Sequence, residues 1–549
     1  MDFAYTNRIC GVGDSKDDEK KGQKLIVDFT IGIFFDGTCN NKYNFQYARD
    51  AYKDFDKDDY GSYHGSFTNV AQMWFLYDAS GEYTKKIYVE GPRTAKPIEV
   101  KEKNRYKDED DFMSSGKKDS DMAAASGSGE LGINAKIERG CKQIKKKIYS
   151  MFQKDKFFVV NSITLDVFGF SRGAASARRF VSCLSGAGNT KTEGYKVSLM
   201  RDYLNDMRFA KTEVAVRFLG LFDTVSSYEC LHGKIEREAM TAIRDRGRPM
   251  SFNLLPEAYY AGKSGVKLKF RDFTNDVSEL GLSIPEGVKH VVHLVAANEY
   301  RENFALTTVD TAKGLGANCI EYVLPGAHSD IGGGYPPFEK EYLYQKEGLP
   351  RMSEVNDPNS RAFIGCMPFA ELFKRRWIND FLYKFALEQY KLTSEIDNRL
   401  AGRRYSSVAD LPKYQAPYRV VRNDYAKIPL DIMYRYAKLF LLPLQSVQGV
   451  KGKNNAVVEK VLIIPDTEDD PDLKLLKRVG NAIMKKAMAR QRLYAICNDG
   501  IYYVYKGTDV DVLSIRRKFI HLSATVKDLF EPHVATKNRK RTIIRDNRK

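Results

Sequence analysis

The sequence predicts an α/β fold in which helices cover both faces of a mostly parallel sheet, and a largely helical C-terminal region follows. Nearly continuous apolar segments, typical of buried parallel strands, recur along residues 25–340. Segments with helical periodicity separate several of them, and this alternation is typical of a parallel sheet. Beyond about residue 341, long amphipathic segments predict helices instead.

The individual elements are expected in the following order along the chain. Strands are expected at residues 25–35, within "KKIYVEGPRT" and "SITLDVFGF", and at residues 213–223, 288–297 and 318–330. Helices are expected at residues 69–76, within "ELGINAKIERGCKQIKKKIYSMF", and from Ala174 to about Leu184. We therefore predict an irregular segment over 1–24, a domain with insertions over 25–340, and a mainly helical region over 341–549 that is a candidate membrane-contacting module.

The composition limits the class of protein and of partner. The 549 residues are 43% hydrophobic and 12% aromatic, which provides a large core and excludes a disordered chain. There are 88 Lys and Arg against 71 Asp and Glu, so the surface should attract nucleic acid, phospholipid headgroups or an acidic partner. The final "KNRKRTIIRDNRK" is expected to be a basic tail, solvated or touching an anionic membrane, because no nucleic-acid motif accompanies it.

Cysteine usage and the N-terminus predict where the chain is made. The 8 cysteines contain no CxxC pair, which argues against a zinc ribbon or a disulfide scaffold and favours a reducing compartment. The N-terminus lacks the basic start and apolar core of a signal peptide, and no apolar run reaches the ~18 residues of a membrane span. We expect a cytoplasmic protein that is secreted, if at all, without a signal peptide.

The segment "DVFGFSRGAASARRF" places Ser171 between a strand and an Ala-rich helix. One interpretation is a tight turn with an incidental serine. Gly169 and Gly173 favour a nucleophile elbow instead, because small flanking residues permit the strained turn that exposes a serine hydroxyl above a sheet. The first amides of the helix would then face the site and stabilise an oxyanion.

A serine nucleophile needs a base, and the chain contains 7 histidines. His328 lies just past an expected strand, in "PGAHSDIGGGY", where glycines 332–334 let the backbone turn sharply. A solvated turn histidine is the alternative interpretation. Four other histidines are interpreted as structural, packed or inserted residues, namely His232, His290, His293 and His521.

The acid is expected between serine and histidine in the chain order of such sites. Asp223 ends the strand at 213–223, where a carboxylate can orient an imidazole and stabilise its charged form. Glu299, after the next strand, is the second choice. Asp330 is too close to His328 in sequence to be preferred.

The oxyanion donors are expected from two backbone segments. One is the amide of Arg172, the residue after the serine, and the other is the turn at Gly37 and Thr38, after the first strand. Asp36 is expected to fix that turn through local amides, not to act as a catalyst.

Two further motifs are weaker signals. Residues 127–132 match GxGxxG, but "DMAAAS" precedes them where a dinucleotide site needs a strand, so a flexible helix entry is favoured. The acidic run at 54–67 fails the EF-hand spacing because Tyr60 and Phe67 occupy ligand positions, and a solvated loop is favoured. Binding of an adventitious cation by this loop remains an alternative. We expect the function to require no metal ion or cofactor.

Four motifs together, "IGIFFDGTCNN", "DVFGFSRGAASARRF", "FLGLFDTVSS" and "PGAHSDIGGGY", resemble the α/β-hydrolase domain of bacterial type VI secretion lipase effectors of the first family. The later "IPLDIMYRYAKLF" and "RRKFIHLSA" look like parts of that family's C-terminal region. By this resemblance the nucleophile falls on Ser171, the acid on Asp223 and the base on His328.

The resemblance implies an antibacterial phospholipase of type A1 or A2. It also implies delivery into a neighbouring bacterium, with the periplasm as the expected compartment, docking on a spike protein of the secretion machine, and an immunity protein in the producer. Two alternatives stay open: a hydrolase of the same fold acting on another ester or thioester, and a catalytically inactive binding module. A missing triad residue would indicate the inactive module, and the sequence has all three.

Overall fold

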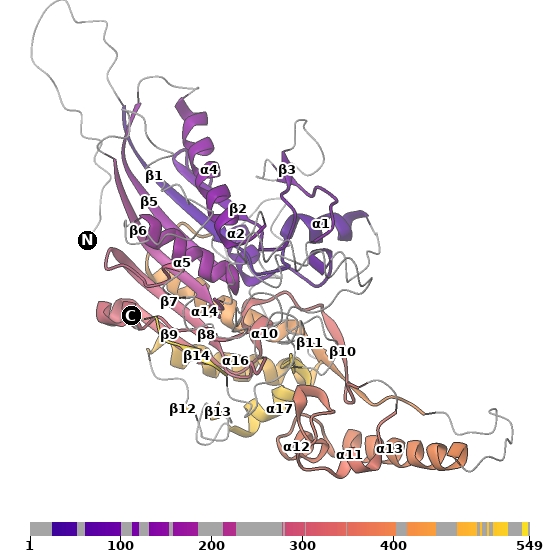
Figure 1. Ribbon diagram of the computed structural model, residues 1–549. Coiled ribbons are helices and arrows are strands. Elements are labelled where there is room, and N and C mark those ends of the chain that lie inside the picture. The colour runs from indigo at the N-terminus through magenta and orange to yellow at the C-terminus, as the bar shows by residue number, and fades with distance from the viewer. Residues whose placement is uncertain are drawn as a thin grey trace, which may run out of the picture.

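A computed structural model describes most of the chain (Figure 1). The described residues are 25–51, 61–99, 112–119, 131–152, 158–184, 212–226, 277, 280–301, 304–346, 349–401, 414–445, 469–490, 495–496, 502–503, 509–524 and 541–546. Several sequence predictions lie outside them: the irregular segment at 1–24, residues 54–60 of the acidic run, residues 127–130 of the GxGxxG match, and His232.

Six strands form the central sheet in the order β2-β1-β5-β6-β7-β9. Their bounds are Leu25–Phe35 for β1, Thr84–Val89 for β2, Phe158–Phe170 for β5, Glu213–Phe222 for β6, Val288–Ala296 for β7 and Cys319–Leu324 for β9. Each neighbouring pair is parallel. All six overlap segments in which the sequence predicts strands, so the prediction of a mostly parallel α/β sheet is confirmed.

The other elements surround this sheet. The longer helices are α1 (Lys42–Ala51), α2 (Asn69–Leu76), α4 (Ile133–Phe152), α5 (Arg172–Leu184), α13 (Asp380–Ala401), α14 (Lys427–Leu439), α16 (Pro471–Met488) and α17 (Asp509–Phe519). The shorter ones are η1 (Gly61–Tyr63), η5 (Asp310–Asn318), α10 (His328–Gly332), α11 (Met352–Asn356), η6 (Ile364–Cys366), α12 (Phe369–Lys374) and η8 (Asn423–Ala426). Small strands are β3 (Ile98–Glu99), β4 (Phe112–Met113), β8 (Leu306–Thr307), β10 (Phe338–Tyr342), β11 (Tyr418–Arg422), β12 (Ala495–Ile496), β13 (Tyr502–Tyr503) and β14 (Ile543–Ile544).

Alternate side chains of the sheet strands belong to two separate apolar clusters, as the two-residue periodicity of strands requires. Phe34 of β1 lies in a cluster to which α2, α14, α16 and α17 contribute, whereas its neighbour Ile33 lies in a cluster with α4 and α5. Phe168 and Val167 of β5 divide in the same way. One face of the sheet therefore packs against α2, α14, α16 and α17, and the other packs against α4 and α5.

The carboxyl ends of the parallel strands meet at one edge of the sheet, where ligands of open α/β sheets usually bind. Ser171 follows the last residue of β5, and Asp223 follows the last residue of β6. Glu299 lies three residues beyond β7, and His328 begins α10 after β9. The predicted site residues thus come from four strand ends at the same edge.

The C-terminal part of the chain contains long helices, as the sequence predicts, and α13 extends away from the sheet at the lower right of Figure 1. Side chains of α14, α16 and α17 belong to the same apolar cluster as Phe34 and Phe168 of the sheet. The domain boundary at residue 340 stays a prediction. Among the described helices, none combines the length and hydrophobicity needed to cross a membrane.

The prediction of a solvated or membrane-bound basic tail is wrong for Arg541, Ile544 and Asp546, whose side chains are buried. Ile543 and Ile544 form β14, which pairs in parallel with β8. Arg541 and Asp546 have buried side chains, which are 4% and 0% exposed. The tail therefore contains a short apolar strand among its charged residues. Arg541 pairs with Asp223, and Asp546 pairs with Arg178.

Candidate active site

Ser171 occupies a strained turn between β5 and α5. Its φ is 58°, a conformation that is uncommon for residues with a side chain. Backbone hydrogen bonds hold the turn, since the Ser171 amide donates to the Phe222 carbonyl at 3.0 Å and the Ala174 amide donates to the Ser171 carbonyl at 3.0 Å. This is the backbone arrangement that the sequence predicts for a nucleophile elbow.

The two glycines of the motif have no room for a side chain. A Cβ atom on Gly169 would lie 2.5 Å from the Cα atom of Ala174. A Cβ atom on Gly173 would lie 2.2 Å from the carbonyl oxygen of Asp36. The start of α5 therefore packs directly against the backbone at the end of β1, which places Ser171 beside the turn at residues 36–38.

His328 and Asp223 form a buried pair at the same edge of the sheet. The His328 Nδ1 atom lies 2.5 Å from the Asp223 Oδ2 atom, and the two side chains are 5% and 0% exposed. The imidazole also contacts Phe170, whose ring centroid is 4.6 Å away, and Phe304 at 4.9 Å. Because Phe170 immediately precedes Ser171, the imidazole is held next to the serine turn.

The electrostatics of the pair favour a charged carboxylate and a neutral imidazole. Burial raises the pKa of Asp223, but Arg541 and the hydrogen bond with His328 outweigh burial, so this pKa lies well below its usual range. Burial lowers the pKa of His328, and the Asp223 carboxylate only partly offsets this. At neutral pH His328 is therefore available to accept a proton.

Glu299, the second-choice acid, contacts the backbone of His328 and not its ring. Its Oε2 atom accepts a hydrogen bond from the His328 amide at 3.2 Å and another from the Ser523 hydroxyl at 2.9 Å. The Arg301 side chain forms two further hydrogen bonds with the Glu299 carboxylate, at 2.9 and 3.0 Å, and the Arg301 amide donates a third at 2.8 Å. Burial raises the pKa of Glu299, but Arg301 outweighs it and brings this pKa down to about 2. The geometry thus favours Asp223 as the partner of the imidazole.

The turn after β1 is fixed by Asp36, as the sequence predicts. Its carboxylate accepts hydrogen bonds from the Gly37 amide at 2.7 Å, the Tyr88 hydroxyl at 2.5 Å and the Thr68 hydroxyl at 2.7 Å. The Gly37 amide therefore already has a partner, and the Thr38 amide is the better candidate from this turn to face an oxyanion. The Thr38 hydroxyl accepts a hydrogen bond from the Arg172 Nε atom at 2.7 Å, which links the turn to the residue after Ser171.

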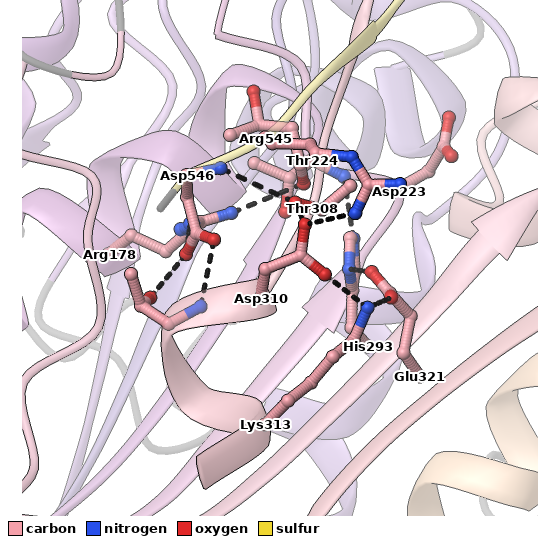
Figure 2. Close-up of polar contacts among 12 residues, drawn as sticks. Arg178, Asp223, Thr224, His293, Thr308, Asp310, Lys313, Glu321, Arg545 and Asp546 are labelled. Carbon is pink, nitrogen blue, oxygen red and sulfur yellow. Dashed lines mark hydrogen bonds and ion pairs between the residues drawn. The ribbon is translucent and has the colours of Figure 1, made fainter. Parts of the chain in front are cut away.

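The histidines predicted to be structural have structural contacts. His293, in β7, accepts a hydrogen bond from the Thr224 amide at 3.1 Å, and its other ring nitrogen lies 3.1 Å from Glu321 (Figure 2). His290 stacks on Phe440 with ring centroids 3.8 Å apart. His293 therefore supports the residue that follows Asp223 and does not compete with His328 for the role of base.

Sequence reasoning missed Arg541 as a contact of the site, and it missed the partner of His521. Arg541 donates two hydrogen bonds to the Asp223 carboxylate, at 2.6 and 2.8 Å. His521, which lies just beyond α17 and not within it, contacts Asp330 through its Nδ1 atom at 2.6 Å and stacks on Tyr335. The pair of isoleucines after Arg541 was the only local sign that the basic tail is folded, and nothing local pointed to the partner of either residue.

The described residues contain no group of three or more His, Cys, Asp or Glu side chains that could hold a metal ion. At this edge of the sheet the structure places the side chains of Ser171, Asp223 and His328.

Comparison with known families matches residues 189–355 to the catalytic domain of Tle1-like phospholipase effectors of the type VI secretion system. Residues 189–355 are therefore similar to a Tle1-like catalytic domain. The Tle1-like match includes Asp223, Glu299 and His328 and begins after Ser171. The motifs around these residues resemble type VI secretion lipase effectors in the sequence, and this match confirms that resemblance. Phospholipase effectors of this kind are ester hydrolases.

Among solved structures, the Tle1 effector bound to the VgrG spike from the type VI secretion system is 19% identical over 94% of each chain, with a TM-score of 0.46. An uncharacterized protein from Pseudomonas aeruginosa is 17% identical over 84% of this chain and 52% of its own, with a TM-score of 0.36. No curated protein matches the chain by sequence.

Proposed function

We propose that the chain is a serine esterase of the α/β-hydrolase fold that cleaves acyl esters of membrane phospholipids in the manner of a phospholipase A. The observation that carries this proposal is the buried 2.5 Å contact between His328 and Asp223, next to the strained turn of Ser171. The match of residues 189–355 to Tle1-like phospholipase effectors supports the choice of phospholipid as the substrate.

The reaction would begin with attack by the Ser171 Oγ atom on an acyl carbonyl carbon of the phospholipid. His328 takes the serine proton as the new C–O bond forms, and the carbonyl π electrons move to the oxygen. The amides of Arg172 and Thr38 are the proposed donors to this oxyanion. When the intermediate collapses, the ester C–O bond breaks and the lysophospholipid oxygen leaves with the proton from His328.

Water completes the cycle by hydrolysing the acyl-enzyme. His328 removes a proton from the water, the hydroxide adds to the acyl carbon, and collapse returns the proton to the Ser171 oxygen as the fatty acid leaves. Asp223 would orient the imidazole and stabilise its charged form in both halves. No step requires a metal ion or an organic cofactor.

The proposal places the enzyme in the setting of a type VI secretion effector. The producing cell would make it in the cytoplasm, load it through a spike protein, and deliver it to the periplasm of a neighbouring bacterium, where it degrades phospholipid. Because the producer's own membrane contains the same substrate class, an immunity protein that blocks the enzyme is part of the proposal.

The region after residue 340, together with the strand β10 that leads into it, is proposed to help hold the enzyme on a bilayer. The paired strands β10 and β11 expose Phe338, Tyr342, Tyr418 and Val420, and Lys340 lies over the Tyr418 ring at 4.9 Å from its centroid. Aromatic rings combined with cationic side chains are typical of surfaces that lie at a membrane interface. β10 begins shortly after α10, the short helix that starts at His328.

The test is release of fatty acid from diacyl phospholipid vesicles by purified protein, with Ser171→Ala as the matched variant. We expect the substitution to abolish release, leaving only background. Equal release by both proteins would refute the serine mechanism. Hydrolysis of soluble esters or thioesters without phospholipid hydrolysis would identify a same-fold enzyme for another substrate, and no hydrolysis at all would identify a binding module. Position-labelled phospholipid in the same assay distinguishes cleavage at sn-1 from cleavage at sn-2.

A further inference from the structure

The last described residues of the chain form a short segment that reaches the back of the candidate site. We call residues 541–546 the C-terminal strap. Its strand β14 pairs with β8, with hydrogen bonds from the Leu306 amide to the Thr542 carbonyl at 2.8 Å and from the Thr308 amide to the Ile544 carbonyl at 2.9 Å. The strap is therefore joined to the chain between β7 and β9, the two strands that precede Glu299 and His328.

The far end of the strap is anchored by a buried ion pair. Asp546 accepts a hydrogen bond from Arg178 of α5 at 2.7 Å, and neither side chain is exposed (Figure 2). The Thr311 amide donates to the same carboxylate at 2.9 Å. A pair buried in this way holds its geometry, because separating the charges would leave one of them desolvated and unpaired.

The near end of the strap presents Arg541 to Asp223. The guanidinium donates to both carboxylate oxygens, at 2.6 and 2.8 Å, and its Nε atom donates to the Phe304 carbonyl at 2.8 Å. The Ala296 amide adds a hydrogen bond to the Asp223 Oδ1 atom at 2.8 Å. These donors fix the carboxylate plane and leave the Oδ2 atom directed at the imidazole.

We propose that Arg541 is a positioning residue for the catalytic acid, so that the C-terminal strap completes the active site from a point 318 residues away in sequence. This inference rests on the proposed function. Arg541 acts through Asp223: it fixes the orientation of the carboxylate and neutralises part of its charge. A carboxylate with less effective charge stabilises the imidazolium less, so Arg541 keeps His328 neutral and ready to act as a base at neutral pH.

The decisive measurement is the pH dependence of kcat/KM on a soluble ester, for the wild type and for Arg541→Met and Arg541→Gln. Both variants remove the charge, and we expect the acid limb of the profile to move up by about one pH unit or more. Activity at neutral pH should fall several-fold and partly return at alkaline pH. Arg545→Gln is the matched control, because Arg545 lies on the same strap, is 56% exposed and pairs with Asp310.

A second measurement does not depend on turnover. The chain has only 7 histidines, so the pKa of His328 can be followed by NMR of protein labelled at histidine and assigned with His328→Gln. Removing the Arg541 charge should raise this pKa, and Arg545→Gln should leave it unchanged.

The outcomes separate this inference from the function on which it rests. Folded Arg541 variants with the wild-type pH profile and an unchanged His328 pKa would overturn the inference, as would failure of both variants to fold, which would assign Arg541 to the fold alone. Wild-type protein without Ser171-dependent hydrolysis would instead refute the proposed function. A raised His328 pKa in the Arg541 variants of such a protein would still support the positioning role.

Discussion

Replacing Gly173 by alanine should disrupt the nucleophile turn without removing any polar group. The new Cβ atom would lie 2.2 Å from the Asp36 carbonyl oxygen and 2.4 Å from the Phe35 carbonyl oxygen. Ordinary contacts of a Cβ atom begin near 3.4 Å, so α5 and the end of β1 must separate by about 1 Å. Because both obstacles are backbone atoms, no change of side-chain rotamer can relieve the clash.

The cost of that separation can be estimated for stability and for activity. Overpacking of a tight site costs about 1–3 kcal/mol in the free energy of unfolding. A displacement of about 1 Å between a nucleophile and its oxyanion donors costs on the order of 100-fold in rate. We therefore expect Gly173→Ala to fold with a lowered Tm and to lose most of its esterase activity.

The measurement combines thermal unfolding with hydrolysis of a soluble ester that needs no membrane. Gly287→Ala is the matched control, since no described atom beyond Gly287 and its two chain neighbours lies within 4 Å of the Cβ position there. If Gly173→Ala matches Gly287→Ala in both Tm and rate, the close approach of α5 to β1 does not hold the serine turn, and the reasoning fails.

Three further predictions follow from buried polar contacts. Asp223→Asn should keep the fold but lower kcat by about 10⁴-fold, because the amide favours the wrong imidazole tautomer; a kcat close to that of the wild type would argue against Asp223 as the acid. Arg178→Met should cost about 3–5 kcal/mol in stability by leaving Asp546 buried and unpaired, and chemical denaturation should show a smaller loss for Arg178→Met combined with Asp546→Asn. The pKa of His521 is raised above 6.5 because Asp330 outweighs burial, so its contribution to stability should be complete below pH 6.5 and lost as pH rises through the raised value. The difference in stability between wild type and His521→Gln should therefore shrink at alkaline pH, and a constant difference would refute the charge on His521.

The sequence was sufficient for the features that depend on local pattern. The bounds of β1 and α2 agree with the predicted ranges 25–35 and 69–76, because apolar runs and helical periodicity reflect burial within one element. The turn at Ser171 was also predictable, since glycines on both sides of the serine are required by the backbone itself.

The choice between Asp223 and Glu299 was different in kind. Both acids follow a strand at the edge of the sheet where Ser171 lies. The sequence showed only that both come between Ser171 and His328 along the chain. In the folded chain Asp223 contacts the imidazole, whereas Glu299 contacts Arg301 and the backbone of His328. The choice of acid depends on a contact between residues 105 positions apart and on the direction of each side chain. The local pattern of apolar and polar residues contains neither.

The sequence by itself determined the parallel sheet, the strained serine turn and the family resemblance. Tertiary structure alone decided that the Gly37 amide is already bonded, that Asp330 contacts His521, and that a basic tail returns to hold Asp223 through Arg541. The physical reason is that local periodicity reports whether a residue is buried, but not which distant group it meets. From the sequence, a charged residue such as Arg541 is predicted to be solvated. Its burial becomes favourable only because the fold places a carboxylate beside it.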